Sequence, residues 1–393
     1  ERAMTLSRAI EAGARRGPAV LESLRGRDAA TAFARDPGSP LPAPPQVTVL
    51  AGARKPYNLP TGPEVAVTVQ QGLATRGLGA ARRRAADWAA RAATSDVERA
   101  RLEGAATAAL AWIDLLEAEG LIRVRAATSD DAAKLAAIAE ARVTSGVATA
   151  VERALARAEI GASRLALLDG EGRETEARLA LAHATGTPPT ERLVAEGSLA
   201  SAPEDGAEPG AVLGGVASHP SVRAAEARAA QAEADGSVTR ALLGPTLSVG
   251  GTVWREGSGD HAAAALVTLP LPFFDASRHD VGRQATIAAA ASGHAARLRA
   301  ELAHEASLAI HEREHTREVR EALHDGVVEP LRSALATAMT AYSAGTSELA
   351  VVLVARRSAL AAEERFVTAT ADVWRADVRV GALAGTLTRG VIR

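Results

Sequence analysis

The feature that most constrains this sequence is a helical pattern that runs from Arg278 to about Tyr342 with a single proline inside it, Pro330. An α-helix rises about 1.5 Å per residue, so some 60 residues extend on the order of 90 Å, several times the length of an ordinary globular helix. A turn with a glycine at Gly345 follows, and a second apolar helical run begins at Leu349. A helical hairpin of this length does not fit inside a compact globular domain.

Apolar residues recur at every fourth position of the long helix. Because a helix turns about 100° per residue, steps of four drift by roughly 40° each, and the apolar stripe winds around the helix. The pattern therefore predicts neighbours on more than one side of the helix, and Pro330 predicts a kink. The stripe consists of Leu298, Leu302, Ala306, Ile310, Val319, Leu323, Val327, Leu331, Leu335 and Met339.

An earlier part of the chain repeats this plan. A helical pattern from near Gly79 to about Arg142 reverses around Gly146 and returns as a helix towards His183. Landmarks in the two halves keep a nearly constant offset, and this regularity predicts two structural repeats. Pro18 and Pro220 are 202 residues apart, Gly79 and Gly282 are 203 apart, and the pairs Gly146/Gly345 and Gly186/Gly385 are 199 apart.

Four segments alternate between apolar and polar residues instead of following a helical period: 46–54, 64–72, 246–254 and 262–269. In the first segment Val47 and Val49 fall on one face and Thr48 on the other. Turn residues separate the members of each pair, so the sequence predicts two β-hairpins, at 46–72 and 246–269.

These patterns predict a mainly α fold with a small β part. The first repeat covers residues 1–186, with the tip of its helical hairpin near residue 146. A linker rich in proline, glycine, alanine and acidic residues covers 187–218. The second repeat covers 219–393, with its tip near residue 345.

The strands have the length and alternation of membrane-spanning β-strands. Each has about nine residues, as a tilted strand needs to cross a bilayer, with one apolar and one polar face. Single-chain barrels begin at about eight strands, and an open sheet edge in lipid leaves backbone groups unpaired at several kcal/mol each. If these strands lie in a membrane, several chains must therefore share one barrel, and three chains of four strands each would supply twelve. The alternative is a soluble scaffold in which two hairpins cap a coiled-coil rod.

The composition excludes several classes of function. A formal net charge of −2 provides no electrostatic basis for binding nucleic acid. The absence of cysteine excludes a disulfide framework and a thiolate nucleophile. No apolar run reaches the ~18 residues of a transmembrane helix. The chain begins at Glu1 without a signal peptide, so we expect a processed or trimmed sequence.

One motif suggests a different chemistry. Residues 311–315, His-Glu-Arg-Glu-His, place His311 and His315 on one helical face, with Glu312 as the general base of a zinc-dependent hydrolase. The helix continues without the turn that would bring a third ligand, and His304 lies on the same rod surface. We expect a solvated charged helix face here, with incidental metal binding and zinc-dependent hydrolysis as alternatives. No phosphate-binding loop or nucleophile motif is found elsewhere, so no cofactor is expected.

Four stretches carry a resemblance to a known family: residues 219–228 (His-Pro-Ser-Val-Arg-Ala-Ala-Glu-Ala-Arg), 270–275 (Pro-Leu-Pro-Phe-Phe-Asp) with Arg278, Tyr342-x-x-Gly345-x-x-Glu348-Leu349, and 374–387. Through the order and duplication of these stretches, the chain resembles the outer-membrane factor family, which comprises the TolC-like outer-membrane efflux proteins. Within this family it most closely resembles the heavy-metal and multidrug efflux types. The resemblance covers essentially the whole chain.

The resemblance implies a homotrimer in the bacterial outer membrane, with a twelve-stranded β-barrel and a periplasmic tunnel of long α-helical hairpins. It implies a passive channel without enzymatic activity. The partners implied are a periplasmic adaptor protein, an inner-membrane pump and outer-membrane lipid.

The same resemblance assigns roles to the hairpin tips. The positions implied to dock on the adaptor are Arg142, Gly146, Val147, Ala148, Tyr342, Gly345, Thr346 and Ser347. Family members often carry aspartates just past the second tip, at the closed periplasmic entrance. This sequence departs from that pattern with Val351 and Val354, so either Glu348 replaces the acidic gate or the constriction is apolar.

Overall fold

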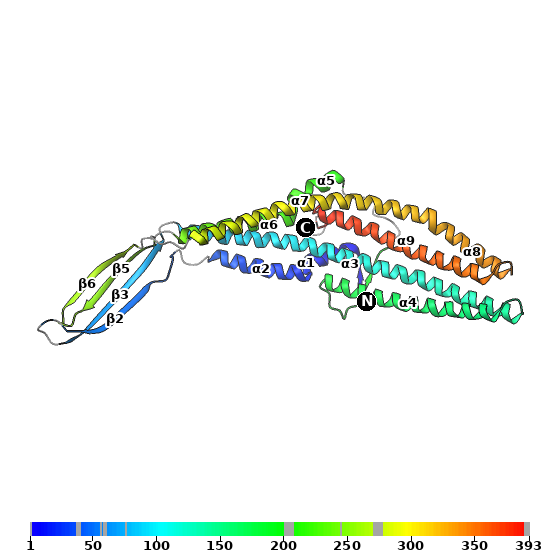
Figure 1. Ribbon diagram of the computed structural model, residues 1–393, viewed down its shortest axis with the longest axis horizontal. Helices are drawn as coiled ribbons and strands as arrows, with labels where there is room; N and C mark the ends of the chain where they lie inside the picture. Colours follow the sequence, from blue (N-terminus) through cyan, green and yellow to red (C-terminus); the bar gives the residue numbers. More distant parts are fainter. Residues whose placement is uncertain are drawn as a thin grey trace. The chain divides into compact units, whose positions relative to one another are not determined.

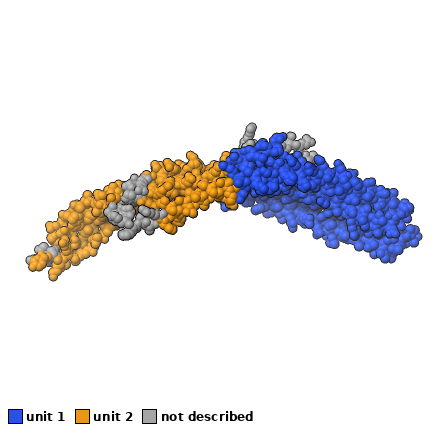
Figure 2. Space-filling view, turned by 45° about the horizontal axis from the view of Figure 1, so that its top comes forward, with its two compact units in different colours: residues 1–23, 97–220, 299–393 blue, residues 24–96, 221–298 orange. Residues whose placement is uncertain are grey.

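The computed structural model of the 393-residue chain describes residues 2–36, 41–55, 57, 61–74, 77–199, 208–243, 246–269 and 278–388. The described chain is mainly helical with a small β part, as predicted (Figure 1). It forms two compact units, each built from both halves of the sequence (Figure 2). Unit 1 contains residues 1–23, 97–220 and 299–393, and unit 2 contains residues 24–96 and 221–298.

The helices follow the same order in both halves of the chain. Pro18 and Pro220 each stand at the first position of a helix, where the missing N–H leaves no hydrogen bond unmade. Two residues later, Val20 and Val222 are both fully buried. The helices of the first half are α1 (Leu6–Arg16), α2 (Pro18–Arg35), α3 (Leu78–Thr144) and α4 (Ala150–Ala184). Those of the second half are α5 (Pro209–Gly215), the 3-10 helix η1 (Val216–Ser218), α6 (Pro220–Leu242), α7 (Arg278–Leu323), the π-helix η2 (His324–Val328), α8 (Glu329–Ser343) and α9 (Leu349–Leu383).

The core of unit 1 lies between α1, α3, α4 and α9. Trp112 of α3 is buried, its indole Nε1 donates a hydrogen bond to Met4 O at 2.7 Å, and its ring meets Trp374 of α9 edge-on at 6.4 Å between centroids. Met4 ends β1 (Arg2–Met4), which pairs in parallel with β4 (Leu193–Ala195) inside the expected linker. This pair was not predicted from the sequence, because three-residue strands are too short to show a period.

Helices α1 and α3 approach each other closely at two glycines. A Cβ atom at Gly13 would lie 2.3 Å from Gly104 O, and a Cβ atom at Gly104 would lie 2.5 Å from Gly13 O. Neither position has room for a side chain, since interiors pack too densely to absorb such overlaps without backbone movement.

At Pro330 the long helix changes its hydrogen-bond pattern. Helix α7 ends at Leu323, residues 324–328 form the π-helix η2, and the Glu329 N–H donates to His324 O, five residues earlier. Proline has no N–H and its ring crowds the preceding turn. The wider π turn accommodates both effects, and α8 continues the helical path.

Unit 2 contains a four-stranded antiparallel sheet in the order β2 (Gln46–Arg54), β3 (Gly62–Ala74), β5 (Thr246–Arg255) and β6 (His261–Thr268). The central β3–β5 pairing joins the two hairpins, with Val67 opposite Val253 and Thr68 opposite Thr252. This pairing joins into one sheet two hairpins that were predicted as separate elements.

The register gives the sheet two chemically different faces. One row across the strands consists of Val49, Val67, Val253 and Ala263, and the adjacent row on the opposite face of Thr48, Thr68, Thr252 and Ala264. The Thr68 and Thr252 hydroxyls form a hydrogen bond at 2.8 Å. Val49 and Val253 remain 63% and 57% exposed, so the valine face of the sheet is uncovered within this chain.

Some residues that the sequence singles out lie outside the described part of the chain. Residues 270–275, which contribute to the family resemblance, belong to this group, and so does the side chain of Arg278. None of the helices in the described ranges has an apolar stretch long enough to cross a membrane.

Candidate functional site

The tip of the first helical hairpin lies between α3 and α4. Gly146 has a φ of 76°, which favours glycine, and its N–H donates to Val143 O at 3.0 Å. The N–H groups of Val147 and Ala148 both donate to Arg142 O, at 2.9 and 3.1 Å. These bonds satisfy carbonyl groups at the end of α3 and define a compact reversal.

The tip of the second hairpin, between α8 and α9, has the same construction. Gly345 has a φ of 79°, and its N–H donates to Tyr342 O at 3.1 Å. Both the N–H and the hydroxyl of Thr346 donate to Ala341 O, at 2.9 and 3.0 Å. Ser347 is partly exposed, and Glu348 stands at the N-cap of α9, although its side chain makes no capping hydrogen bond.

A polar network joins the two tips within unit 1. The guanidinium of Arg142 donates from Nη1 to Tyr342 O and lies over the Tyr342 ring, with Cζ 4.4 Å from the centroid. The Tyr342 hydroxyl donates to Glu152 Oε2 at 3.2 Å. Burial raises the pKa of the Tyr342 phenol and the Glu152 carboxylate raises it further, so the hydroxyl remains a donor. The structure therefore brings together two predicted tip residues, Arg142 and Tyr342.

Glu152 was not among the predicted site residues, although the sequence contains a signal for it. Thr149-x-x-Glu152 is a capping box, in which the Glu152 N–H donates to Thr149 Oγ1 at 3.3 Å and the Thr149 N–H donates to Glu152 Oε1 at 3.5 Å. Glu152 therefore caps α4 with one oxygen and receives the Tyr342 hydroxyl with the other.

The residues assigned to the gate lie on the exposed side of α9. Val351 and Val354 are 53% and 67% exposed, and Glu348 is also exposed. On the opposite side of the same turns, Leu349 and Val352 pack into an apolar cluster with residues of α3, α4 and α8. Helix α9 thus begins with one face anchored in unit 1 and one uncovered valine face.

A buried ion pair lies below the tips. Arg356 of α9 is 3% exposed, and its guanidinium donates to Glu159 Oε1 of α4, to Ser163 Oγ at 2.8 Å and to Thr128 O of α3 at 2.6 Å. Burial lowers the pKa of Arg356, and the negative charge of Glu159 opposes this effect. The network holds α3, α4 and α9 in register. Its sequence signal is an arginine on the otherwise apolar stripe of α9.

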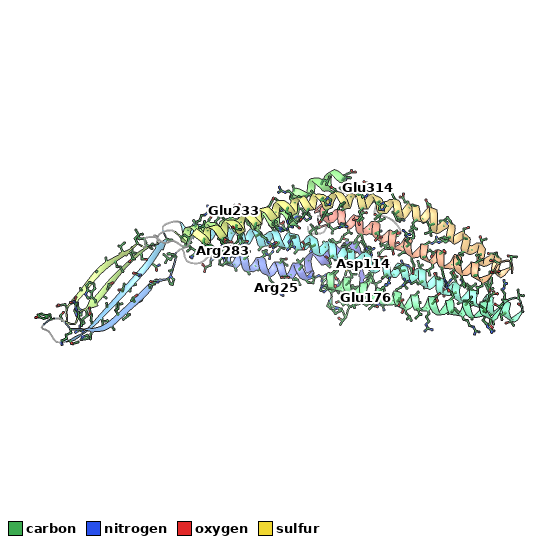
Figure 3. All side chains as sticks on the ribbon, in the orientation of Figure 1. Arg25, Asp114, Glu176, Glu233, Arg283 and Glu314 are labelled. Carbon is green, nitrogen blue, oxygen red and sulfur yellow. The ribbon has the colours of Figure 1, made fainter. Side chains whose placement is uncertain are left out.

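A second charged cluster joins α3 and α9 nearer the middle of unit 1. Arg375 donates to Asp114 Oδ1, labelled on α3 in Figure 3, at 2.6 Å from Nη2, and to Asp372 Oδ1 at 2.8 Å. Its Nη2 also donates to Glu117, which accepts a hydrogen bond from the Thr368 hydroxyl at 2.7 Å. Burial alone would lower the pKa of Arg375, but the hydrogen bonds to Asp114 and Glu117 outweigh it and raise that pKa.

The His-Glu-x-x-His motif lies on an exposed surface of α7. The rings of His311 and His315 are 6.1 Å apart and nearly parallel, with 16° between their planes. Glu312, however, accepts a hydrogen bond from Arg379 Nη1 of α9 at 2.8 Å. Among the described residues, no group of three or more His, Asp or Glu side chains is arranged to hold a metal ion. The geometry does not provide the third protein ligand of a catalytic zinc site.

Comparisons with known proteins give one family match and several structural similarities. Residues 216–386 match the family described as outer membrane efflux protein. No curated protein sequence matches the chain significantly. The following structural similarities, all below 25% identity, show the fold.

The outer-membrane channel OprN superposes with a TM-score of 0.79 at 20% identity, covering 97% of this chain and 90% of that chain. The CmeC outer membrane channel of Campylobacter jejuni has a TM-score of 0.79 at 16% identity, covering 97% and 86%. The open state of the MtrE outer membrane channel of Neisseria gonorrhoeae has a TM-score of 0.74 at 19% identity, covering 99% and 91%.

Proposed function

We propose that this chain is the outer-membrane duct of a tripartite efflux system, because residues 216–386 match the outer membrane efflux protein family. It conducts substrates passively to the exterior from a periplasmic adaptor and an inner-membrane pump, with its sheet in the outer membrane and its helices in the periplasm. The alternative of a zinc-dependent hydrolase is not favoured, since Glu312 pairs with Arg379 and matched structures are channels.

The two-faced sheet of unit 2 carries this proposal. Its outer strands, β2 and β6, each pair with one neighbour inside the sheet. In lipid, unpaired edge groups cost several kcal/mol each, so the sheet requires further strands on both sides. Four strands are fewer than the roughly eight of the smallest barrels, whereas three copies supply twelve. In this arrangement the valine face meets lipid and the threonine face lines the lumen.

Exposed aliphatic residues on α4 support the same assembly. Val151, Leu155 and Leu165 are 66%, 47% and 65% exposed, and they fall within about 80° of the helix circumference. Such an uncovered apolar stripe is typical of an interaction surface. In a homotrimer, the helices of a neighbouring copy cover it and close the tunnel wall.

The two tips form the adaptor-docking surface in this proposal. The Arg142–Tyr342–Glu152 network holds the turns together before the partner arrives, which lowers the entropic cost of docking. Val147 is 65% exposed and offers the adaptor an apolar contact. The docking residues are Arg142, Gly146, Val147, Ala148, Tyr342, Gly345, Thr346 and Ser347.

Val351 and Val354 form the periplasmic gate in this proposal, with Glu348 beside them at the start of α9. Three copies of two exposed valines create an apolar constriction, which impedes ions by excluding water. We expect the double variant Val351→Asn with Val354→Asn to wet the constriction and raise single-channel conductance in a planar bilayer. Val147→Asn, an equally exposed valine on the other hairpin, serves as the control and is expected to leave conductance unchanged. Unchanged conductance in the double variant would remove the gate assignment.

The mass of the detergent-extracted protein, together with its bilayer conductance, tests the proposed function. We expect a complex of three chains that requires detergent for extraction and conducts ions after reconstitution. A water-soluble monomer without conductance would refute the duct and support the soluble scaffold.

A further inference from the structure

Two imidazoles stand one helical turn apart on the exposed surface of α7. They belong to His311 and His315, on either side of Glu314, which is labelled in Figure 3. Their ring centroids are 6.1 Å apart and their planes differ by 16°. We propose that this pair forms a two-histidine site for a divalent transition-metal cation of the class that prefers imidazole, Cu²⁺, Ni²⁺ or Zn²⁺. The site is separate from the duct function proposed above.

The helix supplies the spacing that chelation needs. Residues four apart on an α-helix are neighbours on one face, and the pair lies well inside α7, which covers residues 278–323. Both side chains are exposed, so a change of side-chain rotamer allows each ring to present a nitrogen to one ion at the ~2.0–2.1 Å typical of metal–imidazole bonds. Because the backbone already holds the second ligand close, it binds at a small entropic cost.

The neighbouring charges favour a cation. Glu314 and Glu318 follow His311 and His315 by three residues each, and both are exposed on the same side of α7. Their negative potential raises the local concentration of cations. Glu312, which the hydrolytic motif would use as its base, instead pairs with Arg379.

The ligand count determines the kind of site. No group of three or more potential ligands is found among the described residues, so the pair supplies two nitrogens and water completes the coordination sphere. Structural zinc sites use four protein ligands and catalytic ones use three, so this site binds metal without structural or hydrolytic zinc chemistry. The imidazole set also predicts an order of affinity, with Cu²⁺ above Ni²⁺ and with Mg²⁺ and Ca²⁺, which prefer oxygen ligands, not bound. A bound ion would link successive turns of α7.

Calorimetric titration of Cu²⁺ into the untagged full chain in detergent tests the site. We expect one tight site per chain in the wild type. His311→Ala and His315→Ala are each expected to weaken this binding by about tenfold or more, and the double variant by little more than either single one, because either loss destroys the chelate. Alanine favours helix, so the variants keep α7, which circular dichroism confirms.

His294→Ala is the matched control. His294 is exposed on the same helix, 17 residues before His311 in the sequence, and contacts Arg297. We expect this variant to bind Cu²⁺ like the wild type. Three results would overturn the proposal: wild-type affinity in both single variants, losses that simply add in the double variant, or an equal loss in His294→Ala.

Discussion

An arginine at Val67 tests whether the valine face of the sheet meets lipid. Val67 is the sixth of the 13 residues of β3, close to the middle of the strand, and it is flanked by Val49 of β2 and Val253 of β5. An arginine on the lipid face near the bilayer midplane costs about 2–4 kcal/mol. A trimer carries three copies, so Val67→Arg costs about 6–12 kcal/mol per assembly. This is comparable with the whole stability of an ordinary domain, about 5–15 kcal/mol.

The adjacent residue provides the matched control. Thr68 lies on the opposite face, in the row with Thr48 and Thr252, so Thr68→Arg places the same charge in the lumen. We expect Val67→Arg to abolish the detergent-extracted trimer and its β content. Thr68→Arg is expected to assemble and to shift ion selectivity towards anions in a planar bilayer. Wild-type yield of the Val67→Arg trimer, or equal loss of both variants, would refute the assignment of the two faces.

Three further predictions concern stability. Arg356→Leu removes the buried guanidinium that pairs with Glu159 and leaves this carboxylate only the 3.3 Å contact with the exposed Arg357. We expect the free energy of unfolding to fall by about 3 kcal/mol, the lower end of the range for a broken buried ion pair, and the double variant with Glu159→Leu to recover most of it in chemical denaturation. Gly13→Ala is expected to lower the free energy of unfolding by about 1–3 kcal/mol through overpacking. Gly26→Ala has open space around its Cβ position and is expected to stabilise α2 by up to ~1 kcal/mol. Thermal unfolding measures both variants, and a higher melting temperature for Gly13→Ala than for Gly26→Ala would contradict the packing argument. Burial raises the pKa of Asp235, so wild-type stability falls as pH rises from the ordinary Asp pKa of about 3.9 through this raised value. Asp235→Asn should not show this loss of stability, and it should be more stable than the wild type at pH values above the raised pKa of Asp235. Unfolding curves recorded over a series of pH values test this prediction, and identical pH profiles for the two proteins would refute it.

Local physics explains why so much of the fold is visible in the sequence. The helical and alternating periods depend only on neighbouring residues, and they predicted a long helix from near Gly79 to about Arg142 and a strand at 46–54. The structure places these elements at Leu78–Thr144 and Gln46–Arg54. The glycines of the tips could also be predicted, because each reversal requires a backbone conformation that other residues avoid.

Contacts between distant residues were decided only by the tertiary structure. Arg142 and Tyr342 are 200 positions apart, and no sequence period indicates that one guanidinium will bind the backbone and cover the ring of the other. The β3–β5 register and the burial of Arg356 against Glu159 are of the same kind. The sequence by itself therefore determined the elements, their order and their apolar faces, since these follow from backbone geometry and residue spacing. The tertiary structure decided which faces meet and which charges are paired, since those depend on where the folded chain brings residues together.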